Sequence, residues 1–528
     1  MSGDLLALEL TFVELLLLVF VVAMLAHRIR LPYTVALVLV GLALSFQQTI
    51  QFELTPEIIL LLFLPPLVFE AALHIDYPTF RRVLTPVLLL AVFGVLITMG
   101  IVYGLLTATG LLDWRTALIF ASLIAATDPV AVVSLFKALG APRRLATLVE
   151  SESLFNDATT IVLFHLVTAS MLVYGGSETE MDLLRAVQQF MLVSLGGAGI
   201  GVVTGVLANA IFARVDDHLI EITLSTIVAY GAYLLAEQFH LSGVLAVVFA
   251  GMLIGNRSDM SMSPTTRMVL MNFWEYIAFL ANSLIFILIG MEVVFPRLDR
   301  DGLLLIIAAV AAVLVSRAVS VYGLSFVSRA LRNRVPASYQ HVLFWGGLRG
   351  AVSLALALSI SRTFPGRDTI LTLTFAAVLF TLLVQATTIS PLLRRLGLTG
   401  QSEEEREYER LHARLLAARA AYQRLKQEFR QGTLDPAAWA TIDPELADRV
   451  ERLKQALESF ASSHPDLVAK ITASLRREAL ILQRATITDL AREGVISDEV
   501  ARELITEIDV EIDELRRAPT PLPSTSET

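Results

Sequence analysis

An aspartate followed by a proline lies in the middle of an apolar stretch of this sequence, in the run Ala125-Ala126-Thr127-Asp128-Pro129. A proline inside a helix removes one backbone hydrogen bond, and its ring clashes with the preceding turn. The run therefore predicts a helix that is interrupted midway and that leaves carbonyl groups free near Thr127. Where water is scarce, such an interruption is tolerated only if it lines a cavity or binds a ligand.

A second carboxylate lies in the next apolar stretch, which opens with residues 150–157. Ser153 and Asp157 are four residues apart, so they share one face of a helix. A short basic loop joins the two stretches, and an antiparallel hairpin would bring Asp128 and Asp157 to a similar depth. Oxygen ligands of this kind suit a small hard cation such as Na⁺. The predicted cation- and proton-binding residues are Asp128, Asp157, Thr127 and Ser153, supported by Asn156 and Pro129.

Three glycines surround Arg349 in the run of residues 345–351. Glycine weakens a helix, so this run predicts a second interrupted or weakened helix. An ionisable group in an apolar stretch is costly and marks either a function or a buried pair. Transporters built from inverted repeats carry their interrupted helices at matching positions of the two halves. If the first six and the last six apolar stretches form two halves, the two interrupted stretches correspond.

The composition places these residues in a membrane. The chain is 55% hydrophobic and 17% charged, which is more apolar side chain than a soluble core can hold. The net charge of −9 resides mostly after about residue 400. The absence of cysteine excludes disulfides and thiolate metal sites, and no cofactor is expected. His165, two turns beyond Asp157, is expected to be packed or pore-lining and not to be a ligand.

The expected fold is an all-α polytopic membrane protein with about 13 transmembrane helices. Each span must be helical, because lipid offers no partner to backbone groups. The predicted spans are residues 5–26, 31–47, 57–74, 83–109, 116–136, 152–174, 185–212, 219–236, 241–256, 268–294, 303–328, 339–361 and 368–393.

The basic residues in the loops predict the orientation. Alternate loops, counted from the first, hold about 15 lysines and arginines, against about 6 in the remaining loops. The richer set faces the cytoplasm, so the N-terminus is expected outside and the C-terminal tail inside. The expected location is the plasma membrane.

A glycine-rich run, Gly197-Ala198-Gly199-Ile200-Gly201, has the look of a dinucleotide-binding loop. It lies inside an apolar span with no strand before it, so close packing of helices through small residues is the favoured interpretation.

The chain is expected to divide into a transmembrane domain (1–398), a cytoplasmic helical tail (399–517) and a disordered C-terminus (518–528). Within the tail, one helix is predicted from Glu403 to about Arg430. Another is predicted to begin at Asp443-Pro444, because proline suits a first helical turn. Ser497 is predicted to be the N-cap of a helix over 498–517. The tail is either a solvated helical domain or a site of regulation or dimer contacts.

Four motifs of the apolar block resemble the cation:proton antiporter-1 family, which comprises the NhaP-type antiporters and the related sodium–hydrogen exchangers. The resemblance covers the whole membrane block in order and is weaker in the tail. The motifs are Leu64-Pro65-Pro66-Leu67-Val68-Phe69-Glu70, Ala126-Thr127-Asp128-Pro129-Val130, Glu152-Ser153-Leu154-Phe155-Asn156-Asp157 and Gly347-Leu348-Arg349-Gly350-Ala351.

The resemblance implies a homodimer with a six-helix core that contains the crossed, interrupted helices. It also implies that Asp157 and Asp128 carry the cation, and that Asn156 before Asp157 goes with electroneutral one-for-one exchange. Within the core it implies an internal ion pair of Glu152 with Arg349, and a second buried pair of Glu70 with Arg317 is possible. The partners are then Na⁺ or a related monovalent cation, H⁺ and membrane lipid, without nucleic acid.

One site would serve both substrates, because Asp157 can bind either a proton or, once ionised, a cation. Burial and the neighbouring Asp128 disfavour the charge and so favour proton uptake. A cation channel, which needs no obligatory coupling to protons, is the first alternative. A transporter of organic anions is less compatible with two carboxylates, and an enzyme is not expected. Oxygen ligands serve Na⁺, Li⁺ and K⁺ alike, so the sequence leaves the choice between them open.

Overall fold

We describe a computed structural model of the chain, which defines residues 2–29, 33–45, 58–173, 183–215, 217–261, 264–291, 300–331, 333–398, 403–492 and 495–517. The chain divides into two compact units, Met1–Gly400 and Gln401–Thr528. In both units the described part is helical, and it contains no strand. The predicted domain boundary at residue 399 and the predicted disordered terminus 518–528 lie outside the described residues.

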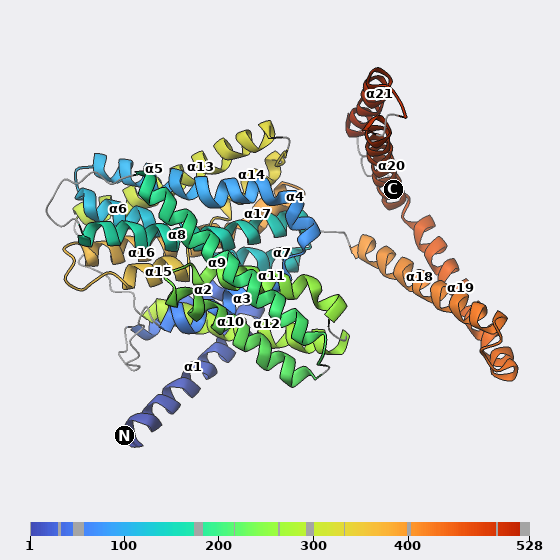
Figure 1. The fold of residues 1–528 in the computed structure, drawn as a ribbon, viewed down its shortest axis with the longest axis horizontal. Coiled ribbons are helices and arrows are strands. Elements are labelled where there is room, and N and C mark those ends of the chain that lie inside the picture. The colour runs from blue at the N-terminus through green and yellow to red at the C-terminus, as the bar shows by residue number, and fades with distance from the viewer. Residues whose placement is uncertain are drawn as a thin grey trace, which may run out of the picture. The chain divides into compact units, whose positions relative to one another are not determined.

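Each predicted span coincides with a helix or with a pair of helices interrupted in the middle (Figure 1). The ends of several predicted spans (31–32, 46–47, 57, 174 and 292–294) lie outside the described residues. The helices of the first unit are α1 (Ser2–Ile29), α2 (Tyr33–Ser45), α3 (Leu64–His74), α4 (Tyr77–Leu88), α5 (Val95–Ala108), α6 (Trp114–Leu123), α7 (Val130–Leu139), α8 (Arg143–Val173), α9 (Leu183–Phe212), α10 (His218–Gln238), α11 (Gly243–Ser261), α12 (Pro264–Met291), α13 (Arg300–Ala330), α14 (Ala337–Trp345), α15 (Ala351–Leu358), α16 (Arg367–Phe380) and α17 (Ala386–Arg395).

Both predicted interruptions are confirmed. The chain leaves the helical conformation between α6 and α7, over residues 124–129, and again between α14 and α15, over residues 346–350. Three short π-helical stretches continue neighbouring α-helices and do not break them: η1 (Ile58–Phe63), η2 (Leu89–Gly94) and η3 (Thr381–Gln385). Such wide turns often occur at functional sites, and η2 follows Pro86, which removes one hydrogen bond from α4.

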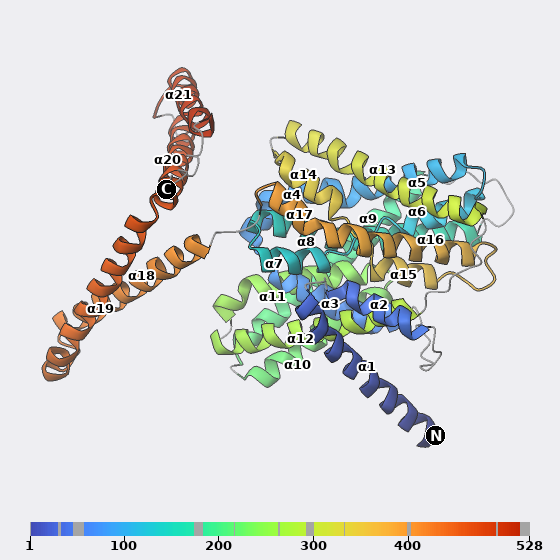
Figure 2. The same ribbon diagram turned by 180° about the vertical axis from the view of Figure 1, so that it is seen from behind.

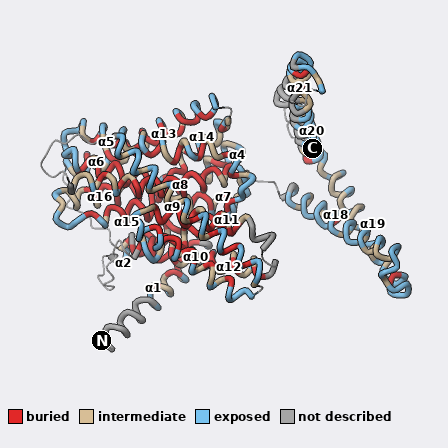
Figure 3. The backbone as a smooth tube through the Cα atoms, in the orientation of Figure 1, coloured by how far each residue is buried: buried red, intermediate tan, exposed pale blue. Residues whose placement is uncertain are grey.

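The helices of the first unit gather into two groups, which both views of the ribbon separate (Figures 1 and 2). One group contains α4–α8 and α13–α17, and the other contains α2, α3 and α10–α12. Helix α9, which overlaps the first group in both views, packs mainly against α11 and α10 and so belongs to the second group. Their buried residues form one continuous apolar core (Figure 3). Seven helical stretches of the described residues are long and apolar enough to cross a membrane, and shorter apolar helices accompany them.

The glycine-rich run of α9 packs against α11. A side chain at Gly197 would lie against the carbonyl of Ser242, and one at Gly201 would lie against the carbonyl of Ala246. The opposite face of α9 is apolar and exposed, with Leu192, Leu195 and Leu207 each more than half accessible. Close helix packing is therefore confirmed, and the exposed face is of the kind that contacts lipid.

The second unit contains α18 (Glu403–Arg430), α19 (Pro436–Ser463), α20 (Pro465–Arg492) and α21 (Asp498–Arg517). The predictions for α18 and α21 are confirmed, and Ser497 Oγ accepts a hydrogen bond from Val500 N at 3.4 Å. The prediction of a helix start at Asp443-Pro444 is wrong. The helix begins one Asp-Pro pair earlier, where Asp435 caps Ala437 N and Ala438 N, and Pro444 lies inside it.

Candidate functional site

The two interrupted helices meet at their breaks. The backbone N–H of Asp128 donates to the carbonyl oxygen of Leu348 at 2.8 Å. Gly350 lies so close that a Cβ at this position would collide with the Asp128 side chain. A Cβ at Gly347 would likewise press on the guanidinium of Arg317. The glycines of this run are therefore needed for close approach, in addition to weakening the helix.

Arg349 holds the break after α6 in place. Its Nη1 donates to the carbonyl oxygens of Ala125 and Ala126, both at 3.0 Å, and its backbone N–H donates to Thr381 Oγ1 at 3.0 Å. These are the carbonyl groups that the Asp128-Pro129 interruption was predicted to free. Because the side chain is buried, the guanidinium takes the place that water would have at these carbonyls.

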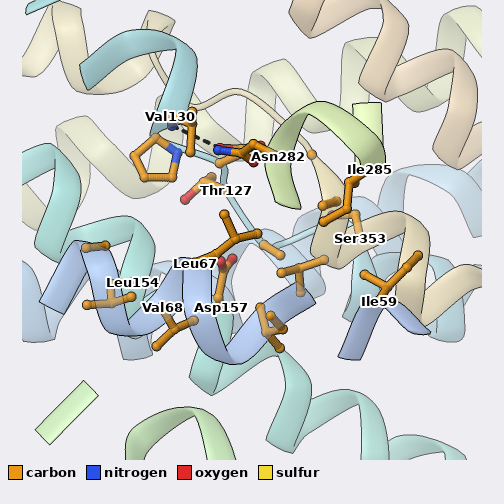
Figure 4. A pocket seen from close by; sticks show the side chains of 18 of the residues that line it. Ile59, Leu67, Val68, Thr127, Val130, Leu154, Asp157, Asn282, Ile285 and Ser353 are labelled. Carbon is orange, nitrogen blue, oxygen red and sulfur yellow. Dashed lines mark hydrogen bonds between the residues drawn. The ribbon is translucent and has the colours of Figure 1, made fainter. Parts of the chain in front are cut away.

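A cavity of about 70 Å³, part of it open to the exterior, lies beside the crossing of the breaks (Figure 4). Its polar lining comes from both helix groups: Thr127, Asp128, Glu150, Asp157, Asn282 and Ser353. Its apolar wall includes Ile59 of η1 and Leu67 and Val68 of α3. The cavity therefore lies at the boundary between the two helix groups, where a relative movement would change its exposure.

Three of the four predicted binding residues, Thr127, Asp128 and Asp157, line this cavity, whereas Ser153 does not line it and reaches it only through Thr127. Thr127 Oγ1 donates to Ser153 Oγ at 3.2 Å, and Asn156 Nδ2 donates to Thr127 Oγ1 at 3.1 Å. Asn156 Oδ1 in turn accepts from Thr160 Oγ1 at 3.1 Å. The amide of Asn156 therefore fixes the hydroxyl of Thr127 between α6 and α8.

The two aspartates differ in their partners. Asp128 Oδ1 accepts a hydrogen bond from Val130 N at 2.9 Å, so this carboxylate also caps the start of α7. Pro129 is the residue directly before this helix. Asp157 Oδ1 is buried and has no hydrogen-bond partner among the described residues. A buried acceptor without a partner is costly, and a cation or a proton would satisfy it. Among all the residues that the structure describes, no group of three or more His, Cys, Asp or Glu side chains is placed to hold a metal ion.

The ion pair expected between Glu152 and Arg349 is not formed, because Glu152 pairs with Arg317. Arg317 Nη1 donates to Glu152 Oε1 at 2.7 Å, and Arg317 Nη2 donates to Glu152 Oε2 at 3.0 Å. The remaining donors of Arg317 reach the carbonyl oxygen of Leu343 at 3.0 and 3.2 Å. This geometry is two-pronged and buried, whereas Arg349 is occupied by the carbonyls of the α6 break.

The possible pair of Glu70 with Arg317 is also not formed. Glu70 contacts His74, four residues later on α3, with 3.2 Å between the carboxylate and the imidazole Nδ1. Arg317 is already engaged by Glu152. His165 does not line the cavity and is exposed on α8 with its ring centroid 5.9 Å from that of Phe164, so it is not a packed core histidine.

Three polar residues of the cavity were not predicted from the sequence. Glu150 lies two turns before Asp157 on α8, Asn282 lies within α12, and Ser353 lies on α15. The signal for Glu150 was its place in the run 150–157, seven residues before Asp157 and so on the same helix face. The signal for Asn282 was an amide in the middle of an apolar span. Asn282 extends from α12 toward the turn that holds Thr127 and Val130 (Figure 4).

Comparison with known proteins gives a consistent result. The profile of a family described as "Sodium/hydrogen exchanger, transmembrane" matches residues 15–395. The low-affinity Na⁺/H⁺ antiporter NhaS1 of Synechocystis is 36% identical over 484 residues, covering 90% of this chain and 91% of the relative. The Na⁺/H⁺ antiporter ApNhaP of Aphanothece halophytica is 37% identical over 480 residues, covering 89% and 90%.

The fold also resembles a solved structure. The sodium proton antiporter MjNhaP1 from Methanocaldococcus jannaschii superposes with a TM-score of 0.62 at 21% identity, covering 75% of this chain and 99% of that one. At this level of identity the likeness concerns the fold alone.

Proposed function

The chain belongs to the sodium/hydrogen exchanger family and is a cation:proton antiporter of the NhaP type, and from this premise we propose that it exchanges Na⁺ for H⁺ at Asp157 and Asp128. The family places it among integral membrane transporters. The relatives NhaS1 and ApNhaP carry Na⁺/H⁺ exchange in their names, which supports Na⁺ as the cation.

The observation that carries the proposal is the buried, partnerless oxygen of Asp157 at a cavity lined by Asp128 and Thr127. Carboxylate and hydroxyl oxygens are the ligands that a hard monovalent cation uses. The Ser153 hydroxyl accepts a hydrogen bond from Thr127 and lies on the same face of α8 as Asp157, four residues before it. We therefore propose that Asp128, Asp157, Thr127 and Ser153 bind the cation and the proton.

Exchange follows if the cation and the proton compete for these oxygens. A protonated Asp157 has no charge with which to hold Na⁺, and bound Na⁺ leaves no favourable place for the proton. An unloaded site carries uncompensated carboxylate charge, which opposes its passage through a low-dielectric region. Asn156 is neutral beside Asp157, so this pair contributes one negative charge, which supports one-for-one, electroneutral exchange.

The proposed architecture contains 13 spans, in which each interrupted helix counts as one. The interrupted spans are then the fifth and the twelfth, at matching positions of two inverted halves. The group formed by α4–α8 and α13–α17 would move against the other group, and alternately open the cavity to either side. We further propose a homodimer in the plasma membrane, with the N-terminus outside and residues 399–517 as a cytoplasmic domain.

Two rival functions remain to be separated by experiment. A K⁺-selective antiporter would use the same oxygens with a larger coordination distance. A cation channel would conduct without moving protons. The interrupted helices and the burial of Asp157 Oδ1 favour an antiporter, because a channel needs a continuous pore.

The purified protein, reconstituted in acidified vesicles with a quenched pH dye, tests the proposal. Na⁺, Li⁺ and K⁺ are added in turn to wild type and to Asp157→Asn. Collapse of the pH gradient by Na⁺ in wild type alone, insensitive to a voltage clamp, supports electroneutral Na⁺/H⁺ exchange. A response to K⁺ alone would mean that K⁺ and not Na⁺ is the transported cation. Activity of Asp157→Asn equal to that of wild type would contradict the proposed site.

A further inference from the structure

Glu150 is a third carboxylate on the cavity that contains Asp128 and Asp157. It is half-buried on α8, seven residues before Asp157, so about two turns or roughly 10 Å of helix separate the two Cα atoms. The side chain therefore shares the aspartate face of α8 but lies nearer to the loop that joins α7 and α8.

The charged neighbours of Glu150 come from both helix groups. Glu70 of α3 and Lys137 of α7 act on its carboxylate. Glu70 in turn is influenced by His74 and by Glu275 of α12. Glu150 thus lies between the two helix groups, at the end of the cavity next to the start of α8, where Arg143 and Arg144 lie. This end is cytoplasmic in the proposed orientation.

The carboxylate of Glu150 forms no hydrogen bond to a described residue and no ion pair shorter than 4.0 Å among them, unlike that of Glu152. A half-buried carboxylate with a cavity on one side and no direct cationic partner attracts a cation. About two turns of helix separate it from Asp157, whereas the ligands of a single cation each lie within about 2.6 Å of it. Glu150 therefore marks a separate position on the same path.

We infer that Glu150 is an outer station of the transport path, at which the cation is held between the cytoplasm and the Asp128–Asp157 site. The inference rests on the proposed function. A negative charge at this position raises the local cation concentration at one mouth of the cavity and leaves the opposite mouth unaffected. The positive charge of Lys137 weakens this attraction, so removal of that charge should strengthen cation binding at Glu150.

The test uses the full-length protein in everted and in right-side-out membrane vesicles, with Na⁺ offered to one face at a time. Glu150→Gln is expected to raise the KM for Na⁺ about tenfold at the cytoplasmic face, because the entering cation loses the attraction of one nearby unit charge in a partly wet cavity. At the outer face the KM is expected to stay within about twofold, because the charge lies on the far side of the site. A structural defect would instead change the KM for Na⁺ at both faces.

The matched control is Asp301→Asn, which removes a carboxylate from an exposed position of α13 outside the cavity. Its KM is expected to equal that of wild type at both faces. Lys137→Gln, a change of an exposed side chain, is expected to lower the cytoplasmic KM about threefold, and it keeps the inference testable if Glu150→Gln does not fold.

An unchanged cytoplasmic KM in Glu150→Gln, or an equal increase at both faces, overturns the inference. So does an unchanged or raised KM in Lys137→Gln. Either result leaves Na⁺/H⁺ exchange by wild type intact. Wild type that shows no exchange at all would instead contradict the proposed function, so the two failures are distinguishable.

Discussion

The backbone N–H of Asp128 donates to the carbonyl oxygen of Leu348 at 2.8 Å, and this bond joins the breaks of two helices that are 220 residues apart in the chain. The aspartate of one break is thereby fixed against the glycine-rich run of the other. Gly350 provides the space, because any side chain there would meet the Asp128 carboxylate.

Replacement of Gly350 by alanine should therefore impair transport. The added Cβ would displace the Asp128 carboxylate, at a cost of about 1–3 kcal/mol in stability and with a loss of at least about tenfold in exchange rate. The measurement is Na⁺-driven proton flux at matched protein density.

Gly104→Ala serves as the control, because a Cβ at Gly104 would have no atom within 4 Å. It should leave both stability and flux unchanged. Normal flux in Gly350→Ala would show that Asp128 tolerates displacement and is not a ligand.

Loss of either member of the Glu152–Arg317 pair should destabilise the protein strongly. Removal of one partner leaves a buried, uncompensated charge, which costs about 3–5 kcal/mol. Glu152→Gln and Arg317→Leu should each lower the temperature at which the detergent-solubilised protein aggregates.

The double variant Glu152→Gln with Arg317→Leu removes both charges together. It should be more stable than either single variant, because the desolvation cost disappears with the pair. A double variant whose loss equals the sum of the single losses would indicate that the two residues act independently.

Asn282 should affect the affinity for the cation. Replacement by leucine removes the polar group that α12 contributes to the cavity, and the KM for Na⁺ should rise by roughly threefold to tenfold with a smaller change in kcat. Ser283→Ala is the matched control, since Ser283 bonds Tyr33 Oη at 2.6 Å and does not line the cavity. If both variants show the same KM, α12 does not take part in binding.

Asp76, in the loop between α3 and α4, should give a pH-dependent contribution to stability. Hydrogen bonds from the Thr79 side chain and N–H hold the pKa of this carboxyl below its usual value, against a small opposing effect of burial. A lowered folded-state pKa means that the contribution is complete above the unfolded value of about 3.9 and is lost as the pH falls through the folded value.

Asp76→Ala should therefore cost about 1 kcal/mol near neutral pH as a lost N-cap, and the difference from wild type should shrink below about pH 4. Thermal unfolding of both proteins between pH 3 and pH 8 checks this. A difference that is constant across this range would show that the charge of Asp76 has no part in capping α4.

The parts of the site that local chemistry controls were predictable from the sequence. Asp128-Pro129 had to interrupt its helix, because proline lacks the N–H that a continuous helix needs. The interruption at the glycine-rich run around Arg349 was also predictable from local chemistry, because glycine weakens a helix. Asp128 and Asp157 could be brought together because one short loop joins their helices.

The ion-pair partners were not predictable in this way. Glu152 and Arg317 are separated by 165 residues, and which arginine approaches Glu152 depends on how distant helices pack. Sequence alone gave no reason to prefer Arg317 over Arg349. In the tail, Asp435-Pro436 and Asp443-Pro444 carry the same local signal. The earlier start of α19 places Trp439 within the helix, where its ring stacks on Tyr422 and Phe429 of α18.

Competition between Na⁺ and H⁺ for one site is tested most directly by the KM for Na⁺ measured as a function of pH in voltage-clamped proteoliposomes. For two ligands that share Asp157, mass action requires the KM to rise about tenfold for each unit of pH below the titration of the site, with an unchanged maximal rate. We predict that result for wild type. A KM that is independent of pH, with proton inhibition confined to the maximal rate, would contradict a shared site.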